Sequence, residues 1–68
     1  MAYKDGKGNL YPEPGDMLRH KGTGIVGRYI SDVTANRGRR HLYVETAEGK
    51  RYCLPANEWE ECEDEQIQ

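Results

Sequence analysis

The chain has 68 residues, of which 35% are hydrophobic and 32% are charged, and its formal net charge is −2. This length allows one domain with a thin core, because a chain of this size buries only about 60% of the surface that its unfolded form exposes. No apolar stretch approaches membrane-spanning length and no apolar run follows the N-terminal methionine, so we expect neither a membrane segment nor a signal peptide. Together with the two cysteines, these features indicate a soluble cytoplasmic protein with reduced thiols.

The small net charge hides a strong asymmetry along the chain. Residues 19–51 contain eight Lys or Arg and three acidic residues, whereas residues 52–68 contain six acidic residues and no base. The overall acidity argues against a general polyanion binder. The basic middle segment nevertheless supplies the charge for a local anion-binding face.

The first fourteen residues are rich in turn formers. Asp5-Gly6 is a good hairpin turn signal between two tyrosine-bearing ends. Pro12 and Pro14 then interrupt the chain, because proline cannot donate a hydrogen bond to a β-ladder. Residues 1–14 therefore form either a short hairpin or a tail, and the sequence leaves both open.

Strand-like segments follow at short, regular spacing. The expected strands are residues 16–20, 25–33, 40–46, 50–54 and 59–62, with a single helical turn at residues 55–58 before the last strand. Gly27 lies inside the longest segment and predicts a bulge or a sharp bend there. Leu42 and Val44 alternate with more polar neighbours, so we expect this pair inside and Tyr43 outside.

Glycine positions and strand alternation together carry a family resemblance. Gly15-Asp16-Met17-Leu18-Arg19 enters the first strand, Gly22-Thr23-Gly24-Ile25-Val26 leads into the second, and Leu42-Tyr43-Val44-Glu45 alternates in the third. Over residues 15–62 this arrangement resembles the SH3-like barrels of the KOW and Tudor-like type. The resemblance implies an all-β fold, a small five-stranded SH3-like barrel with a single helical turn before the last strand.

This resemblance also divides the chain. Residues 1–14 become an N-terminal turn-rich segment or short hairpin, residues 15–62 the barrel, and residues 63–68 an acidic C-terminal tail. The acidic and aromatic first-loop residues by which signalling SH3 domains grip proline-rich peptides are absent. The resemblance therefore implies the fold and not the ligand.

The sequence contains few of the residue combinations that are typical of catalysis or metal binding. Ser31 is the only serine and lacks a Gly-x-Ser-x-Gly setting, and neither His20 nor His41 has an orienting acid at a recognisable spacing. Cys53 and Cys62 lack the Cys-x-x-Cys spacing of zinc sites, and we expect one or both to be small buried side chains. The sequence therefore predicts a binding module that is not an enzyme, with no metal and no cofactor.

Aromatic residues provide one candidate surface. Tudor-like barrels use such rings to hold methylated side chains or extended peptides. Because Phe is absent, some of the rings must instead fill the core, Trp59 foremost, and Tyr43 is the ring that we expect to be exposed. The aromatic side chains considered are Tyr29, Tyr43, Tyr52 and Trp59.

The best candidate for function is a basic loop flanked by tyrosines. Arginine forks pair with phosphates and stack on bases, and tyrosines offer stacking platforms. The alternative, in which these arginines only solubilise the chain or pair with acidic residues, is about equally supported for the cluster as a whole. The predicted binding residues are Arg28, Tyr29, Arg37, Arg39, Arg40 and Tyr43.

Two kinds of partner fit this surface. One is nucleic acid or a nucleoprotein, with the acidic tail limiting non-specific binding. The other is an acidic protein, in which case the chain is a protein-interaction adaptor that uses the same barrel surface. Either role suits a small accessory protein from a bacterial or phage genome, and the basic loop slightly favours nucleic acid. The sequence leaves the oligomeric state open.

Overall fold

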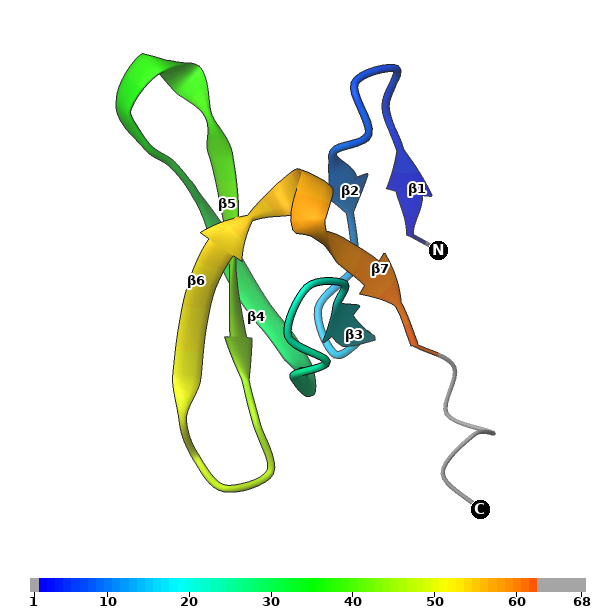
Figure 1. Cartoon of the computed structure of the whole chain (residues 1–68), viewed down its shortest axis with the longest axis vertical. Coiled ribbons are helices and arrows are strands. Elements are labelled where there is room, and N and C mark those ends of the chain that lie inside the picture. Colours follow the sequence, from blue (N-terminus) through cyan, green and yellow to red (C-terminus); the bar gives the residue numbers. More distant parts are fainter. Residues whose placement is uncertain (1, 63–68) are drawn as a thin grey trace.

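The structure, a computed structural model, describes residues 2–62 and is built from antiparallel strands (Figure 1). A hairpin of β1 (Tyr3–Lys4) and β2 (Leu10–Tyr11) precedes a five-stranded sheet with the spatial order β6-β5-β4-β3-β7. Two short 3-10 turns, η1 and η2, connect β4 to β5 and β6 to β7. The remaining elements are β3 (Met17–His20), β4 (Val26–Thr34), η1 (Asn36–Gly38), β5 (Arg40–Glu45), β6 (Arg51–Pro55), η2 (Ala56–Glu58) and β7 (Trp59–Glu61).

The predicted succession of five strands and one helical turn is confirmed. Every boundary of the five strands in the main sheet lies within one residue of its expected position. The first fourteen residues contain a hairpin, in which Tyr3 pairs with Tyr11 and Lys4 with Leu10. The acidic tail expected at residues 63–68 lies outside the described residues.

The main sheet is a meander whose last strand returns to the first. Strands β3 to β6 pair in sequence order, and β7 pairs with β3 through the register His20–Trp59 and Leu18–Glu61. Strands β6 and β7 therefore form the two edges of the sheet, and η2 connects them. The hairpin of β4 and β5 projects beyond its neighbours, as the green ribbon in Figure 1 shows.

The core is small and lies on one face of the sheet. Leu42 and Val44 are fully buried, whereas Tyr43 between them is 39% exposed, which confirms the predicted alternation. Trp59 is also fully buried, as expected, and its indole Nε1 donates a hydrogen bond to the Leu54 carbonyl oxygen at 3.3 Å. We call the opposite face of the sheet, which carries Tyr43, the outer face.

The bulge in β4 does not lie at Gly27. The register between β4 and β5 shifts between Tyr29 and Ser31, so Ile30 is the extra residue. Gly27 instead pairs regularly with Leu18, and a Cβ atom at Gly27 would lie 2.6 Å from the Glu45 carbonyl oxygen. Glycine is therefore needed there because the backbone of β5 passes too close for any side chain.

His20 joins three segments of the chain through its imidazole. The buried ring accepts a hydrogen bond at Nδ1 from the Thr23 backbone N–H at 3.1 Å, and its Nε2 lies 2.7 Å from Glu58 Oε1. The edge of the ring also meets Trp59, with 5.1 Å between ring centroids. Both ring nitrogens are thus occupied by structural partners, one of them an acid that lies 38 residues away in the sequence.

Neither cysteine lies in the core, so the expectation of buried thiols is wrong. Cys53 is exposed on the outer face opposite Tyr43, because β6 is an edge strand whose alternate residues face away from the core. Cys62 is half-buried. Residues 2–62 contain no group of three His, Cys, Asp or Glu side chains placed to hold a metal ion. Within the same residues, no helix has the length and apolarity needed to cross a membrane.

Candidate functional site

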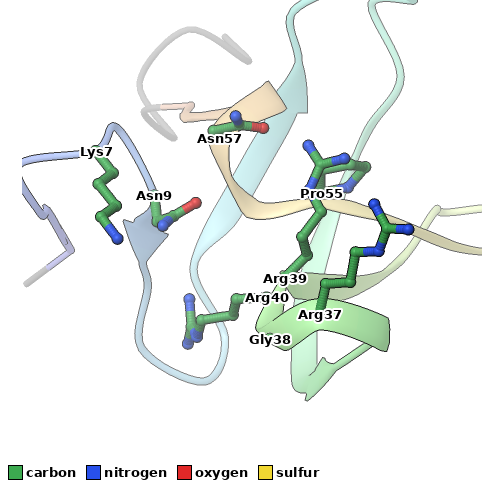
Figure 2. A pocket seen from close by; sticks show the side chains of 8 residues that line it. All are labelled: Lys7, Asn9, Arg37, Gly38, Arg39, Arg40, Pro55 and Asn57. Carbon is green, nitrogen blue, oxygen red and sulfur yellow. The ribbon is translucent and has the colours of Figure 1, made fainter.

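A hollow of about 280 Å³ opens where three segments of the chain meet (Figure 2). The loop of the N-terminal hairpin forms one side, the η1 loop forms another, and the junction of β6 with η2 forms the third. Half of the lining residues are Lys or Arg and none is acidic, so we call it the cationic hollow. Its lining residues are Lys7, Asn9, Arg37, Gly38, Arg39, Arg40, Pro55 and Asn57.

The η1 loop presents two arginines to the cationic hollow. The loop is closed by hydrogen bonds from Ala35 N–H to the Arg39 carbonyl at 2.7 Å and from Gly38 N–H to the Ala35 carbonyl at 3.1 Å. Arg37 has a left-handed backbone with φ of 65°, a conformation that costs a non-glycine residue about 1 kcal/mol. In Figure 2 the side chains of Arg37 and Arg39 both extend from the loop toward Pro55.

These two arginines carry unneutralised charge. Arg37 and Arg39 are exposed, and neither takes part in any of the ion pairs formed among residues 2–62. The Lys7 ammonium on the opposite side is likewise outside those ion pairs. Three cationic side chains therefore line one hollow without an ion-pair partner among residues 2–62, which makes it a candidate site for an anion.

Arg40 lines the same hollow but has a structural role. Its guanidinium pairs with Asp32 at 2.6 Å, donates a hydrogen bond to the Leu10 carbonyl oxygen, and lies 4.0 Å from the centre of the Tyr11 ring. The side chain is only 16% exposed. Arg40 therefore fastens the N-terminal hairpin to the sheet, and its direct binding of a ligand stays a prediction.

Asp5 shapes the hairpin loop that carries Lys7. Its Oδ1 accepts hydrogen bonds from the backbone N–H groups of Asn9 and Lys7, both at 2.9 Å, and its Oδ2 accepts from the Asn9 amide and the Tyr11 hydroxyl. The hydrogen bonds, led by the one from the Asn9 backbone, hold the pKa of the Asp5 carboxyl below its usual range. This network keeps Lys7 and Asn9 on the rim of the cationic hollow.

The other predicted binding residues lie elsewhere. Tyr29 is a core residue with 7% exposure, and its burial raises the pKa of its hydroxyl, so it offers no free ring to a ligand. Arg28 lies beside Glu45 at the other end of β4, about 20 Å from Thr34 for an extended strand. Tyr43 is on the outer face opposite Ser31 and does not line the cationic hollow.

Besides Gly38 and Pro55, three polar lining residues were missed by sequence reasoning. Lys7 and Asn9 belong to the hairpin and Asn57 to η2, so each is far along the chain from the η1 loop. Lys7 and Asn9 meet that loop because Leu10 is buried in the core and draws the hairpin against the sheet. The apolar Leu10 directly after a turn-rich stretch was the one local signal of this docking.

Comparison with family models, with curated proteins and with solved structures found no match for this chain. The functional inference therefore depends on the charge, burial and contacts of the cationic hollow.

Proposed function

We propose that this chain is a non-enzymatic binding module of the SH3-like barrel type, and that its cationic hollow binds the phosphates of nucleic acid. The strand order β6-β5-β4-β3-β7 supports the barrel assignment, because a meander followed by a helical turn and a strand returning to β3 is the connectivity of those barrels. The small core enclosed by Leu18 and Trp59 on this sheet is consistent with it.

One observation carries the ligand assignment. Lys7, Arg37 and Arg39 come from two segments distant in sequence, line the same hollow, and form no ion pair among residues 2–62. Guanidinium and ammonium groups form strong charge-assisted hydrogen bonds with phosphate oxygens. Such contacts are the dominant source of affinity in nucleic-acid binding that does not depend on sequence.

The test compares two double variants that remove the same charge from different places. Arg37→Ala/Arg39→Ala removes two cations from the cationic hollow, and Lys21→Ala/Lys50→Ala removes two exposed cations that do not line it. Arg40 is left in place because its contacts are structural. Binding is followed by fluorescence anisotropy with labelled random-sequence DNA and RNA at low salt.

We expect wild type and the Lys21→Ala/Lys50→Ala control to bind alike and the arginine variant to lose most of its affinity. Circular dichroism checks that all three proteins are folded. The proposal is refuted if wild type does not bind at low salt, or if the two double variants bind equally well.

A second candidate function is a protein-interaction adaptor, and the outer face favours it. Val33 and Tyr43 are diagonal neighbours there, with 41% and 39% of their surfaces exposed, and exposed aromatic and aliphatic side chains are common contacts in protein interfaces. An acidic peptide would then bind through the same arginines. A polyglutamate peptide that binds more tightly than an oligonucleotide of equal charge would favour this adaptor over the nucleic-acid function.

A further inference from the structure

We propose that the nucleic acid held at the cationic hollow is single-stranded, and that one of its unpaired bases stacks on the free face of Tyr3. The inference deepens the phosphate-binding function proposed above and rests on it. It is carried by a stack of side chains on the N-terminal hairpin that ends in an open aromatic ring.

The stack has three layers. The Tyr3 and Tyr11 rings are nearly parallel, with 5.0 Å between centroids and 8° between planes, and the Arg40 guanidinium carbon lies 4.0 Å from the Tyr11 ring centre. Each face of an aromatic ring has room for one stacked group, so Arg40 and Tyr3 occupy opposite faces of Tyr11. The order is therefore Arg40, Tyr11, Tyr3 and then solvent.

Tyr3 is the outermost layer and is unusually open. It is 61% exposed, more than any other large hydrophobic residue among residues 2–62. One face rests on Tyr11, so the exposed area includes the other face of the ring. One face of the Tyr3 ring covers Tyr11, whereas the other face has no role in the fold.

The position of the stack connects this free face to the phosphate site. Arg40 is the inner layer of the stack and also lines the cationic hollow. Only the Tyr11 ring therefore separates Tyr3 from this lining residue. Lys7 in the loop of the same hairpin contributes to the hollow as well. A phosphate at Lys7 and a base on Tyr3 thus fall on one short hairpin.

This combination of ring and cations selects an unpaired strand. Modules that bind single strands combine a positive groove for the backbone with aromatic side chains under the bases, and each stacked base contributes about 1–3 kcal/mol. The bases of a duplex already stack on each other and are not available to Tyr3. The Arg40 contact orders Tyr11, and Tyr11 in turn orders Tyr3. Less conformational entropy is therefore lost when a base stacks on Tyr3.

The test uses three labelled probes: oligothymidylate, an abasic strand of the same length and charge, and a duplex. The readout is the ratio of oligothymidylate affinity to abasic affinity, which isolates stacking from phosphate contacts. The variants are Tyr3→Ala, Tyr3→Leu and Tyr3→Trp, with Tyr43→Ala as the control because Tyr43 is an exposed tyrosine away from the cationic hollow.

We expect Tyr3→Ala and Tyr3→Leu to weaken oligothymidylate binding by about 5-fold to 100-fold, the range that one lost stacking contact gives, and to leave abasic binding unchanged. Tyr3→Trp should restore affinity, and its indole fluorescence should be quenched by oligothymidylate. Wild type should bind the duplex more weakly than oligothymidylate.

The inference is overturned if Tyr3→Ala leaves the affinity ratio unchanged, including by weakening both strands equally, or if the duplex binds as tightly as oligothymidylate. Its failure is distinct from failure of the phosphate function. If Arg37→Ala/Arg39→Ala weakens binding to both strands while Tyr3→Ala does not, only the stacking inference fails. If the arginine variant binds like wild type, the proposed function fails.

Discussion

Replacing Arg40 with alanine should destabilise the protein, although its neighbour Arg39 should tolerate the same change. The Arg40 guanidinium contacts Asp32, the Leu10 carbonyl oxygen and the Tyr11 ring, and these contacts connect the N-terminal hairpin to β4 and β5. Without the guanidinium, the carbonyl oxygen of the buried Leu10 loses its side-chain donor. The hairpin should then separate from the sheet more readily.

The size of the effect follows from these contacts. A hydrogen bond from a charged donor contributes about 1.5–3 kcal/mol, and a partly exposed cation–π contact adds about 0.5–1 kcal/mol. The ion pair adds little, because Asp32 is 44% exposed and solvent screens it. Allowing for overlap between the contacts, we expect Arg40→Ala to lower the free energy of unfolding by about 2 kcal/mol. A single core of this size supplies only about 3–5 kcal/mol in total, so this loss is a large fraction of the stability.

Urea unfolding followed by tryptophan fluorescence measures the loss directly, because Trp59 is the only tryptophan and is fully buried. Arg39→Ala should stay within about 0.5 kcal/mol of wild type, as surface substitutions usually do. Arg40→Lys should fall between the two, because an ammonium keeps the charge but not the planar fork. Equal stability of Arg40→Ala and Arg39→Ala would refute the structural role of Arg40.

Three further predictions concern the backbone and pH. Gly27→Ala should lower the free energy of unfolding by about 3 kcal/mol in the same urea assay, because its Cβ would lie 2.6 Å from the Glu45 carbonyl oxygen; a change below about 1 kcal/mol would contradict that contact. Arg37→Gly should raise the stability by about 0.5–1 kcal/mol by removing the left-handed strain while weakening nucleic-acid binding, and a loss of stability would count against the strain. The pKa of Asp5 is lowered by folding, so its contribution is present above the ordinary value of 3.8 and is lost as the pH falls through the lower folded value. The protection factor of the Asn9 amide, which is its exchange rate relative to the intrinsic rate at the same pH, should therefore fall at acid pH in wild type, and Asp5→Ala should remove that dependence.

The strands were predictable because local patterns determine them. Leu42 and Val44 alternate cleanly with their neighbours, and the turn at Glu48-Gly49 separates β5 from β6 without ambiguity. The inward-facing residues of β4 were harder to predict, because its apolar residues do not follow a period of two. The extra residue at Ile30 changes which side chains face inward, so the burial of Tyr29 could not be deduced from the pattern.

Only part of the candidate site could be predicted, because it is assembled from distant segments. Arg37 and Arg39 were predictable as a cluster, since they share one loop. Lys7 joins them only because the hairpin docks through Leu10 and Arg40, and the apolar Leu10 is the one local sign of that contact. The same docking gives Arg40 structural contacts that its place in the sequence did not predict. The three arginines look equivalent from their spacing in the sequence. They differ in burial, because Arg37 and Arg39 are exposed and Arg40 is mostly buried.

The salt dependence of oligothymidylate binding tests the central claim most directly. Contacts with single strands contribute about −0.7 each to the slope of log K against log salt, so Lys7, Arg37 and Arg39 together predict a slope of about −2 for wild type. The account predicts a slope of about −0.7 for Arg37→Ala/Arg39→Ala and a wild-type slope for Lys21→Ala/Lys50→Ala. The same slope in all three proteins would contradict the assignment of the cationic hollow as the phosphate site.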